Sequence, residues 1–492
     1  MAAVAVFHRI DISAWFDEAY SYGMSTQSWQ SFFSRWVWGS ESNMFLYYLI
    51  LRGWLGLLKL VGAAPNEVLL RLPSALFAIA AAVVVFVLGR RLFGRIAGLV
   101  AGGLFLANFL QMILAQTARA YSLGLLLMCL SWLALFIALE KNSTRWWALY
   151  VAAGVLSVYS LLFSGLVIVS QVLAIGALLI LPTPWRSLVR TAIRRIAVST
   201  GLILLLVLPI GVDAAIHGGP MWVPPAHLND IRLFIHVLAG NSHAYEYLVF
   251  ATVGLAFVLA AAAHLPSLSK LTRGSTASFG SAVALGSWFA TPILISFALT
   301  RPGLNLHLFY PRYLVVVVPP MCLLAGLAVQ ALPLRALQVL LALALAGVAW
   351  TPLMDYYPDA QVQDFKDPMS WVQQRYQTGD GIVCDPDVEC GIPVSYYLDA
   401  HPGPAHLDTD SPGRFSWDGS STVSMTQETL SAYRAEHRRT FFIYGPLGQN
   451  PAQDGIDAAL RTDMAGAGYR LIDYVEARGS GGVTTKVYLY ES

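Results

Sequence analysis

Long apolar segments alternate with short polar ones along the first 355 residues of the chain. A run of about 17–25 apolar residues is long enough for a helix to cross a bilayer. By this criterion the pattern predicts ten spanning helices, at residues 67–89, 96–116, 121–139, 146–162, 164–181, 196–213, 247–264, 281–299, 311–331 and 335–353. The pattern therefore predicts an α-helical polytopic membrane protein.

Segment 45–61, FLYYLILRGWLGLLKLV, has a different pattern. Arg52 and Lys59 share one helical face, and the remaining positions are apolar. This pattern is typical of a helix that lies in the membrane interface, although a short spanning helix stays an alternative. We therefore expect residues 10–66 to form a loop around Asp17 together with interfacial helices.

The tail turns polar from about residue 356, and helical and strand-like segments alternate in it. This alternation predicts a small α/β domain over residues 356–492, after a transmembrane domain over residues 1–355. Helices are expected at DPMSWVQQRYQ, QETLSAYRAEHRR and GIDAALRTDMAGAG, and strands at GIVCDPDV, TFFIYG, YRLIDYVEA and TKVYLYE. Because the tail contains no P-loop and no G-x-G-x-x-G, we interpret it as a cap or acceptor-docking domain.

Composition agrees with a membrane protein, since 12% of the 492 residues are charged and the mean hydropathy is +0.58. A soluble domain carries about 25% charged residues. If segment 45–61 does not span, the most basic loops fall on one side, which the positive-inside rule makes cytoplasmic. These loops are residues 89–95, 140–146, 185–195, 269–273 and 333–335. The other, extracytoplasmic side receives residues 1–66, 115–122, 214–246, 301–313 and everything after about 354.

The ends of the chain and its cysteines give three smaller expectations. Residues 1–9, MAAVAVFHR, look like the last turns of a spanning helix, so we expect a truncated or misassigned start, and no cleavage site follows them. Cys129 and Cys322 lie in apolar runs and are expected to be inert. Cys384 and Cys390 lie close together in the polar tail, where a disulfide stays open.

Candidate chemistry gathers at the predicted outer face, first in SAWFDEAYSYG at residues 13–23. Asp17 and Glu18 suit the start of a helix, where acidic side chains are favoured. They also lie among Trp15, Phe16 and Tyr20, and partial desolvation by aromatic rings raises the pKa of a carboxyl group and makes it a better base. Asp17 is therefore our candidate general base.

Basic and aromatic residues follow at the same predicted level. Arg119 comes after the helix that ends near residue 116, and Arg312 lies in YPRY. An arginine at this depth either extends toward the interface or binds a lipid phosphate with two parallel hydrogen bonds. Further candidates for substrate contacts are Tyr47, Tyr48, Arg52, Tyr121, His307 and Tyr313. The histidines at 217, 227, 236 and 243 match no metal-ligand spacing, so we expect no zinc site there.

The segments ISAWFDEAYS, FLYYLILRGW, AQTARAYSLGLLL and FYPRYLVVVVPP occur in the order seen in GT-C-fold, family-39-like glycosyltransferases. The chain resembles protein O-mannosyltransferases and the aminoarabinose and lipopolysaccharide sugar transferases over about residues 10–330. It departs from the family at NMFLYY (residues 43–48), where the family commonly has H-P-P-L-Y-Y, and at Thr117, which replaces an acidic residue.

The resemblance implies transfer of a hexosyl or pentosyl group from a polyprenyl-phosphate donor on the extracytoplasmic face. It places the family's essential acid on Asp17 and its neighbour on Glu18. We expect inversion, with Arg119, Arg312 and Arg52 at the donor phosphate. The acceptor would be a glycan, a lipid or a protein, and no nucleic acid is expected.

Glu18 would orient the loop or the acceptor, or share a divalent cation with Asp17; apart from that pair, no metal cluster is expected. Two alternatives stay open. A transporter of lipid-linked sugars would need a polar path, yet no predicted span has a charged residue at its middle. A non-catalytic lipid-binding scaffold is the other alternative, and the lost H-P-P and short start favour it.

Overall fold

The computed structural model describes residues 5–38, 43–217, 223–264, 276–304, 306–401, 403–408, 410–415, 423–448 and 453–492. The basic loop at 269–273 and part of the loop at 214–246, both assigned to a side above, therefore lie partly or wholly outside the described residues. Two compact units make up the chain. The helical unit comprises Met1–His8, Ser34–Tyr47 and Ser74–Asp355, and the sheet unit comprises Arg9–Phe33, Tyr48–Pro73 and Tyr356–Ser492.

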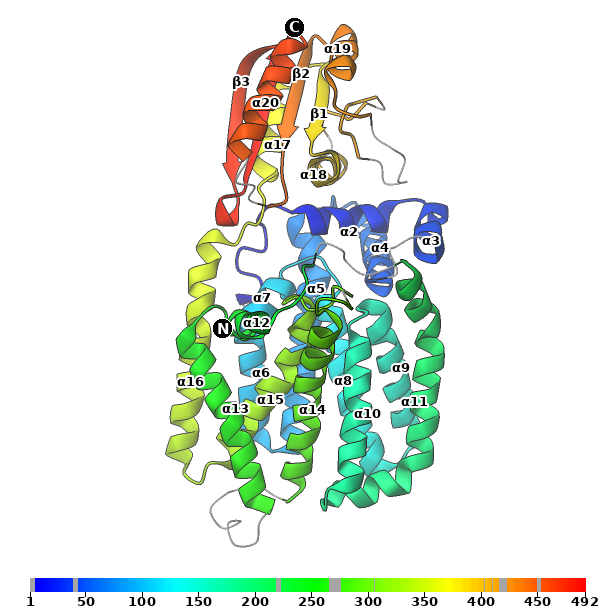
Figure 1. The fold of residues 1–492 in the computed structure, drawn as a ribbon, viewed down its shortest axis with the longest axis vertical. Coiled ribbons are helices and arrows are strands. Elements are labelled where there is room, and N and C mark those ends of the chain that lie inside the picture. The colour runs from blue at the N-terminus through cyan, green and yellow to red at the C-terminus, as the bar shows by residue number, and fades with distance from the viewer. Residues whose placement is uncertain are drawn as a thin grey trace. The chain divides into compact units, whose positions relative to one another are not determined.

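The helical unit is a bundle of helices that run side by side (Figure 1). Its described elements are α5 (Glu67–Leu92), α6 (Arg95–Ala107), α7 (Phe109–Ala115), α8 (Tyr121–Lys141), α9 (Thr144–Ser160), α10 (Ser164–Ile180), α11 (Pro184–His217), α12 (Leu228–Leu238), α13 (His243–His264), α14 (Thr276–Leu299), the 3-10 turn η2 (Tyr313–Val317), α15 (Val318–Ala331) and α16 (Arg335–Tyr356). The first turns of α5 belong to the sheet unit.

Every apolar segment predicted to span is helical, and seven of the described helices are long and apolar enough to cross a membrane. They are α5, α8, α11, α13, α14, η2 with α15, and α16. Helices α9 and α10 have 17 residues each, about 26 Å at 1.5 Å per residue, which is shorter than a hydrocarbon core of about 30 Å. The polytopic fold is confirmed, and the number of ten spans stays a prediction.

The predicted span at 96–116 is broken at Asn108, where α6 and α7 meet at 64°. The side chain of Asn108 caps α7 by accepting a hydrogen bond from the Gln111 backbone N–H at 3.1 Å, and its Nδ2 donates to the Leu238 carbonyl at 2.9 Å. An asparagine oxygen competes with the helical backbone for donors, which explains the break. The bent pair counts as an eighth span if it crosses as one.

Close backbone packing forms the core of the helical unit. Helix α15 is almost wholly buried, and α6 packs against it so tightly that a Cβ atom on Gly326 would overlap the carbonyl oxygen of Ala97. A Cβ atom on Gly98 would lie 2.5 Å from the carbonyl oxygen of Phe86 in α5. Small residues at helix crossings bring backbones together in this way in membrane bundles. By contrast, α11 is mostly exposed, as a helix that faces lipid would be.

Helices α2 (Phe16–Thr26), α3 (Trp29–Trp38) and α4 (Phe45–Leu60) precede the bundle. Helix α4 covers the segment predicted to lie in the interface. With 16 residues it is about 24 Å long, and it is not among the candidate spans. Its length agrees with the interfacial interpretation, which stays a prediction.

The sheet unit carries one four-stranded sheet in the order β1-β2-β4-β3, with β1 (Gly381–Asp385), β2 (Arg439–Tyr444), β3 (Arg470–Arg478) and β4 (Thr484–Glu491). Strands β1 and β2 are parallel, and the other two pairs are antiparallel. The other elements of the tail are η3 (Tyr357–Asp359), α17 (Lys366–Arg375), α18 (Asp387–Ala400), α19 (Gln427–Glu436), α20 (Gln453–Gly466) and η4 (Ser480–Gly482). All seven elements predicted in the tail are confirmed.

Two features of the sheet unit differ from the sequence interpretation. Helix α18 was missed because Gly391 and Pro393 interrupt its helical pattern, yet its apolar residues pack against α2 through a T-shaped contact of Tyr22 and Tyr396 at 5.1 Å. That packing also draws residues 9–33 and 48–73 into the tail's unit, whereas composition alone placed the boundary at residue 355. Cys384 and Cys390 are buried free thiols in this structure.

Candidate active site

The start of α2 is held by a buried ion pair between Glu18 and Arg71. The two side chains are 0% and 2% exposed, and they pair through two parallel hydrogen bonds, from Nε to Oε1 at 2.7 Å and from Nη2 to Oε2 at 2.5 Å. The Glu18 carboxylate also accepts from the backbone N–H of Trp15 at 3.4 Å. Glu18 therefore fixes the first turn of α2 from within.

The guanidinium of Arg71 uses all five of its N–H donors. Besides Glu18, it donates to the carbonyl oxygens of Ile10, Ile12 and Ser13 at 2.7–2.9 Å. Such an arrangement compensates the desolvation of both charges, which an isolated buried pair does not achieve. Arg71 consequently ties the backbone of residues 10–13 to the start of α2.

Sequence reasoning did not single out Arg71, because it lies at the beginning of a segment predicted to span. A signal was available, since an arginine within the first turns of an apolar helix requires an acidic or carbonyl partner.

A second buried network continues from this loop. Tyr397 of α18 donates to Glu67 Oε1 at 3.0 Å and accepts from the Ala14 backbone N–H at 2.9 Å. Ser13 Oγ lies 3.0 Å from the same phenol oxygen and accepts from the Phe365 backbone N–H at 2.9 Å. The segment before α2 is therefore anchored on both sides by side chains of the sheet unit.

Asp17 is the second residue of α2 and is half-buried, whereas its neighbour Glu18 is fully buried. Successive helical residues point in different directions, so the two carboxylates have different surroundings. A divalent cation shared by the pair does not fit this arrangement, because both oxygens of Glu18 already accept from Arg71. The geometry suits one half-buried carboxylate that is supported by a fully buried one.

In the helical unit, Arg119 lies in the turn between α7 and α8 and is half-buried. Ser74 Oγ donates to the carbonyl oxygen of Arg119 at 3.2 Å and lies 2.9 Å from the hydroxyl of Tyr47, which is fully buried. Gln116 holds the same turn by donating to the carbonyl of His8 at 2.8 Å. The structure thus connects two predicted site residues, Tyr47 and Arg119, through Ser74.

Arg312 is half-buried and precedes η2, with its guanidinium carbon 5.2 Å from the ring centroid of Tyr310. Tyr313 is buried and stacks on Phe163 at 4.7 Å, which fixes the start of η2. His307 has a positive φ of 55° and pairs through Nδ1 with the carbonyl oxygen of Val223.

The other predicted residues make contacts within the fold, and their roles in substrate binding stay predictions. Arg52 donates to the carbonyls of Ser25 and Gln27 at 3.2 and 2.6 Å, and its guanidinium carbon lies 3.9 Å from the ring centroid of Trp29. Tyr48 is buried in the sheet unit, and Tyr121 is buried at the start of α8. Arg52 therefore holds the end of α2 and the start of α3.

Asp17 belongs to the sheet unit, and Arg119 and Arg312 belong to the helical unit. Their convergence on one substrate stays a prediction. Within the sheet unit, polar and apolar side chains line a pocket of about 460 Å³. They come from residues 27 and 28 between α2 and α3, from Ser31 of α3, from residues 395, 398 and 399 of α18, and from residues 405–407, 414 and 415. Although Asp399 is exposed, its carboxylate is partly desolvated in this pocket, which raises its pKa, and the positive charge of Arg414 opposes that rise.

The sequence profile of the family described as dolichyl-phosphate-mannose-protein mannosyltransferase matches residues 45–211. Comparison with curated protein sequences gives no match. Among solved structures, the chain is similar to ArnT from Cupriavidus metallidurans in the apo state, with a TM-score of 0.57, 14% identity and coverage of 99% of this chain and 96% of that one. The same protein bound to undecaprenyl phosphate gives a TM-score of 0.55, with the same identity and coverage.

The chain is also similar to the archaeal oligosaccharyltransferase AglB from Archaeoglobus fulgidus in complex with an inhibitory peptide and a dolichol-phosphate. This match has a TM-score of 0.52 and 12% identity, and it covers 99% of this chain and 73% of that one. At such identities the similarity concerns the fold. The predicted resemblance to GT-C-fold glycosyltransferases is confirmed at that level.

Proposed function

We propose that this GT-C-fold chain is an integral-membrane glycosyltransferase. It moves a sugar from a polyprenyl-phosphate donor to an acceptor hydroxyl on the extracytoplasmic face, with inversion at the anomeric carbon and Asp17 as general base. The profile match and the likeness to a protein crystallised with undecaprenyl phosphate support this donor class.

The observation that carries the proposal is the fixed conformation of the segment that precedes Asp17. Glu18 accepts two of the five hydrogen bonds that the Arg71 guanidinium donates, and backbone carbonyl oxygens of residues 10–13 accept the other three. These bonds fix residues 10–13 and the first turn of α2. A general base must be held within hydrogen-bond reach of the proton that it removes. A carboxylate on a mobile loop would lose that geometry, whereas Asp17 stands on a turn that is fixed by a buried neighbour.

In the proposed step, the acceptor oxygen attacks the anomeric carbon and its proton passes to Asp17. The bond between that carbon and the phosphate oxygen breaks, and the polyprenyl phosphate leaves with the electron pair. Arg119 and Arg312 stabilise the charge that develops on the phosphate, as positioned cations do for other leaving groups. We assign Glu18 and Arg71 to positioning. We assign Arg52 to the turn between α2 and α3, because its Nη1 donates to two carbonyl oxygens there and its guanidinium lies over the Trp29 ring.

We propose no step through a divalent cation, since Glu18 is neutralised by Arg71. Tyr47 contributes through Ser74 by holding the turn that carries Arg119. The polar pocket beside α18 is our candidate for contacts with the acceptor, which agrees with the acceptor-docking role expected for the tail.

The test compares Asp17→Asn with Asp11→Asn, a matched control at an exposed carboxylate in the same segment. Purified protein in nanodiscs receives undecaprenyl-phosphate-linked mannose or aminoarabinose and a membrane extract as acceptor, and release of undecaprenyl phosphate is measured. Because general base catalysis contributes about 10²- to 10⁴-fold to the rate, we expect Asp17→Asn to lower turnover by that factor. Asp11→Asn should turn over at the rate of the unmodified protein.

Undecaprenyl phosphate binding, measured in parallel, separates the alternatives. The transferase predicts that Asp17→Asn binds the lipid normally, and that Arg119→Ala and Arg312→Ala weaken binding. A lipid-binding scaffold predicts binding without turnover in the unmodified protein. Near-normal turnover of Asp17→Asn contradicts the assignment of the base.

A further inference from the structure

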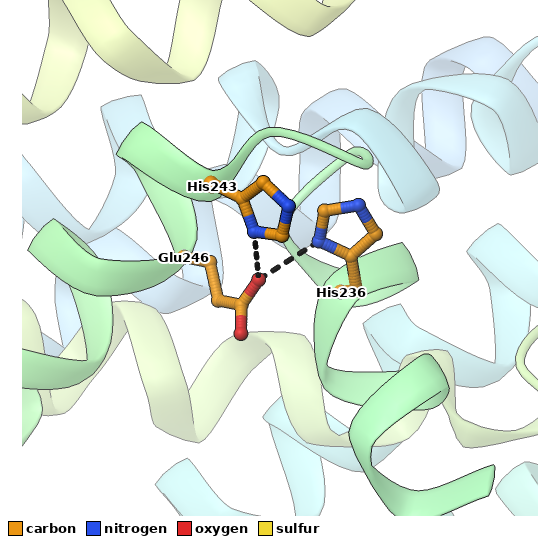
Figure 2. Close-up of side chains that lie close together, drawn as sticks. All are labelled: His236, His243 and Glu246. Atoms are coloured by element: carbon orange, nitrogen blue, oxygen red, sulfur yellow. Dashed lines mark hydrogen bonds and ion pairs between the residues drawn. The ribbon is translucent and has the colours of Figure 1, made fainter. Parts of the chain in front are cut away.

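We propose that His236, His243 and Glu246 form a binding site for one zinc-class divalent cation. Figure 2 shows the three side chains converging from two consecutive helices. His236 lies in the last turn of α12, His243 is the first residue of α13, and Glu246 lies in the first turn of α13. The site is independent of the proposed transfer reaction.

The ligand atoms lie close to the separations that a metal requires. Nδ1 of His236 is 2.8 Å and Nδ1 of His243 is 3.3 Å from the same carboxylate oxygen, Oε2 of Glu246. One ligand atom from each residue lies within 4.8 Å of the others. Tetrahedral zinc with bonds of about 2.0–2.1 Å places its ligand atoms roughly 3.3 Å apart. Small side-chain rotations therefore suffice to admit the ion.

The backbone between the two helices fixes this arrangement. Gly240 and Asn241 have positive φ values of 65° and 58°, which turn the chain sharply between the two histidines. A Cβ atom on Gly240 would lie 2.6 Å from Pro352 Cβ, so no larger residue fits without movement. Asn108 holds the end of α12 through its bond to the Leu238 carbonyl. The ligands are thus presented by a rigid turn between helices.

Exposure leaves one side of the site open. The side chains of His236 and Glu246 are 24% and 15% exposed, whereas that of His243 is 65% exposed and stacks on Tyr247 with ring centroids 5.9 Å apart. Three protein ligands with an open fourth position are typical of zinc sites that keep a water or another ligand. We expect solvent to complete the coordination.

The donor set selects the class of metal. Imidazole nitrogen favours zinc and its transition-metal neighbours, whereas magnesium and calcium favour oxygen ligands alone. Two neutral imidazoles and one carboxylate leave a net charge of +1 with a divalent ion, so the site does not carry excess negative charge. When the ion binds, each ring carries its remaining proton on Nε2, and neutral rings release no net proton.

The sequence did not predict the site, because the spacing His-x6-His-x2-Glu matches no common zinc motif. The turn at residues 239–242 brings the first histidine back over the first turn of the next helix. Glu246 ends the predicted loop at residues 214–246, directly before an apolar segment.

The experiment measures Zn²⁺ binding calorimetrically to the full chain in detergent after removal of metals with a chelator. We expect one equivalent of Zn²⁺ that is not displaced by Mg²⁺ or Ca²⁺. His236→Ala, His243→Ala and Glu246→Gln should each weaken binding by at least about tenfold, since even indirect supporters of metal sites have that effect. Co²⁺, bound instead, should give the visible bands of a four- or five-coordinate ion, and His243→Ala should abolish them.

Two control variants make the result specific. His227→Ala removes an exposed histidine at the start of α12 and should leave Zn²⁺ binding unchanged. His437→Ala disrupts the other group of His and Asp residues close enough to hold a metal, Asp408, Asp410 and His437, within the described residues. Absence of Zn²⁺ uptake overturns the proposal. Binding that survives both His236→Ala and His243→Ala, or that is lost only in His437→Ala, also overturns it.

Discussion

At the scale of single residues, the two adjacent carboxylates near the start of the chain have separate roles. Glu18 is buried against Arg71 and receives two of its hydrogen bonds, whereas Asp17 is half-buried one position earlier on α2. A buried ion pair of this kind stabilises a fold little more than an apolar pair of the same shape would. Removing one partner, however, leaves an uncompensated buried charge and is strongly destabilising. The pair therefore acts mainly on geometry, by holding the turn that carries Asp17.

Arg71→Met tests this role. The substitution leaves the Glu18 carboxylate buried without its partner and should lower the free energy of unfolding by about 3–5 kcal/mol. Arg91→Ala is the matched control, because Arg91 pairs with Glu140 at a partly exposed position and should cost at most about 1 kcal/mol. Unfolding is followed by circular dichroism in a denaturing detergent titration.

The double variant Glu18→Gln, Arg71→Met separates charge from shape. Removing both charges should restore part of the stability lost in Arg71→Met, while turnover stays low because residues 10–13 lose their anchor. Equal stability of the single and double variants would contradict the role assigned to the buried charge.

At the scale of elements, close approach between helix backbones decides how the bundle packs. Gly326 of α15 lies against the Ala97 carbonyl of α6, and α15 is the most buried of the candidate spans. Gly254 of α13 is also helical, yet a Cβ atom there would contact nothing within 4 Å. The same residue type therefore has a packing role in one helix and no such role in the other.

Gly326→Ala should destabilise the protein by about 1–3 kcal/mol, because the added methyl group forces α6 and α15 apart. Gly254→Ala is the control and should be neutral, or stabilising by up to about 1 kcal/mol, because alanine favours the helix. Thermal unfolding of both variants in one detergent measures the difference. Similar midpoints for the two variants would argue against the tight crossing.

At a second element, α18, we expect Asp399 to make stability depend on pH. Partial desolvation of its carboxylate raises the pKa above the value of an unfolded chain, so the folded state keeps the proton to higher pH. Folded protein then binds more protons than unfolded protein between the two pKa values, and stability falls as the pH rises through the raised one.

Asp399→Asn should remove this contribution. We expect the variant to be more stable than the unmodified protein at pH 7 and to lose that advantage at pH values below the pKa of about 3.9 of an unfolded aspartate. Asp473→Asn, at a partly paired and exposed position, controls for the loss of a charge. Thermal midpoints measured from pH 3.5 to pH 8 check the expectation, and a difference that is independent of pH would contradict it.

At the scale of the whole molecule, the proposed chemistry depends on sidedness. Basic residues cluster in alternate loops of the predicted topology, which would place the loops around Asp17, Arg119 and Arg312 and the sheet unit on the extracytoplasmic side. These residues can act on one lipid phosphate only if their loops lie on the same side of the membrane.

Fusions of reporter proteins test this topology. Alkaline phosphatase joined after residue 492 should be active, because it folds only outside the cytoplasm, and a green fluorescent protein at the same point should be dark. The same reporters inserted at residues 140–146 should give the opposite result. An active phosphatase at 140–146, or a fluorescent C-terminus, would contradict the topology and with it the proposed face of reaction.

The sequence by itself determined the membrane class, the positions of the helices and the α/β character of the tail. Apolar length and strand–helix alternation are local signals, and they persist whatever the segments pack against. It also indicated Asp17 and Glu18 as candidate site residues, because the two carboxylates lie among aromatic residues in the sequence. It failed at α18, where a glycine and a proline concealed a helix that packing against α2 stabilises.

Only the tertiary structure decided which side chains meet. Arg71 finds Glu18 across 53 positions of sequence, and Asn108 reaches the end of α12 across 130. The close approach of the His236, His243 and Glu246 side chains depends on a turn with two positive φ angles. No periodicity encodes such pairings, because a buried charge, an amide or an imidazole ring selects its partner by position in space, and the folded backbone alone sets that position.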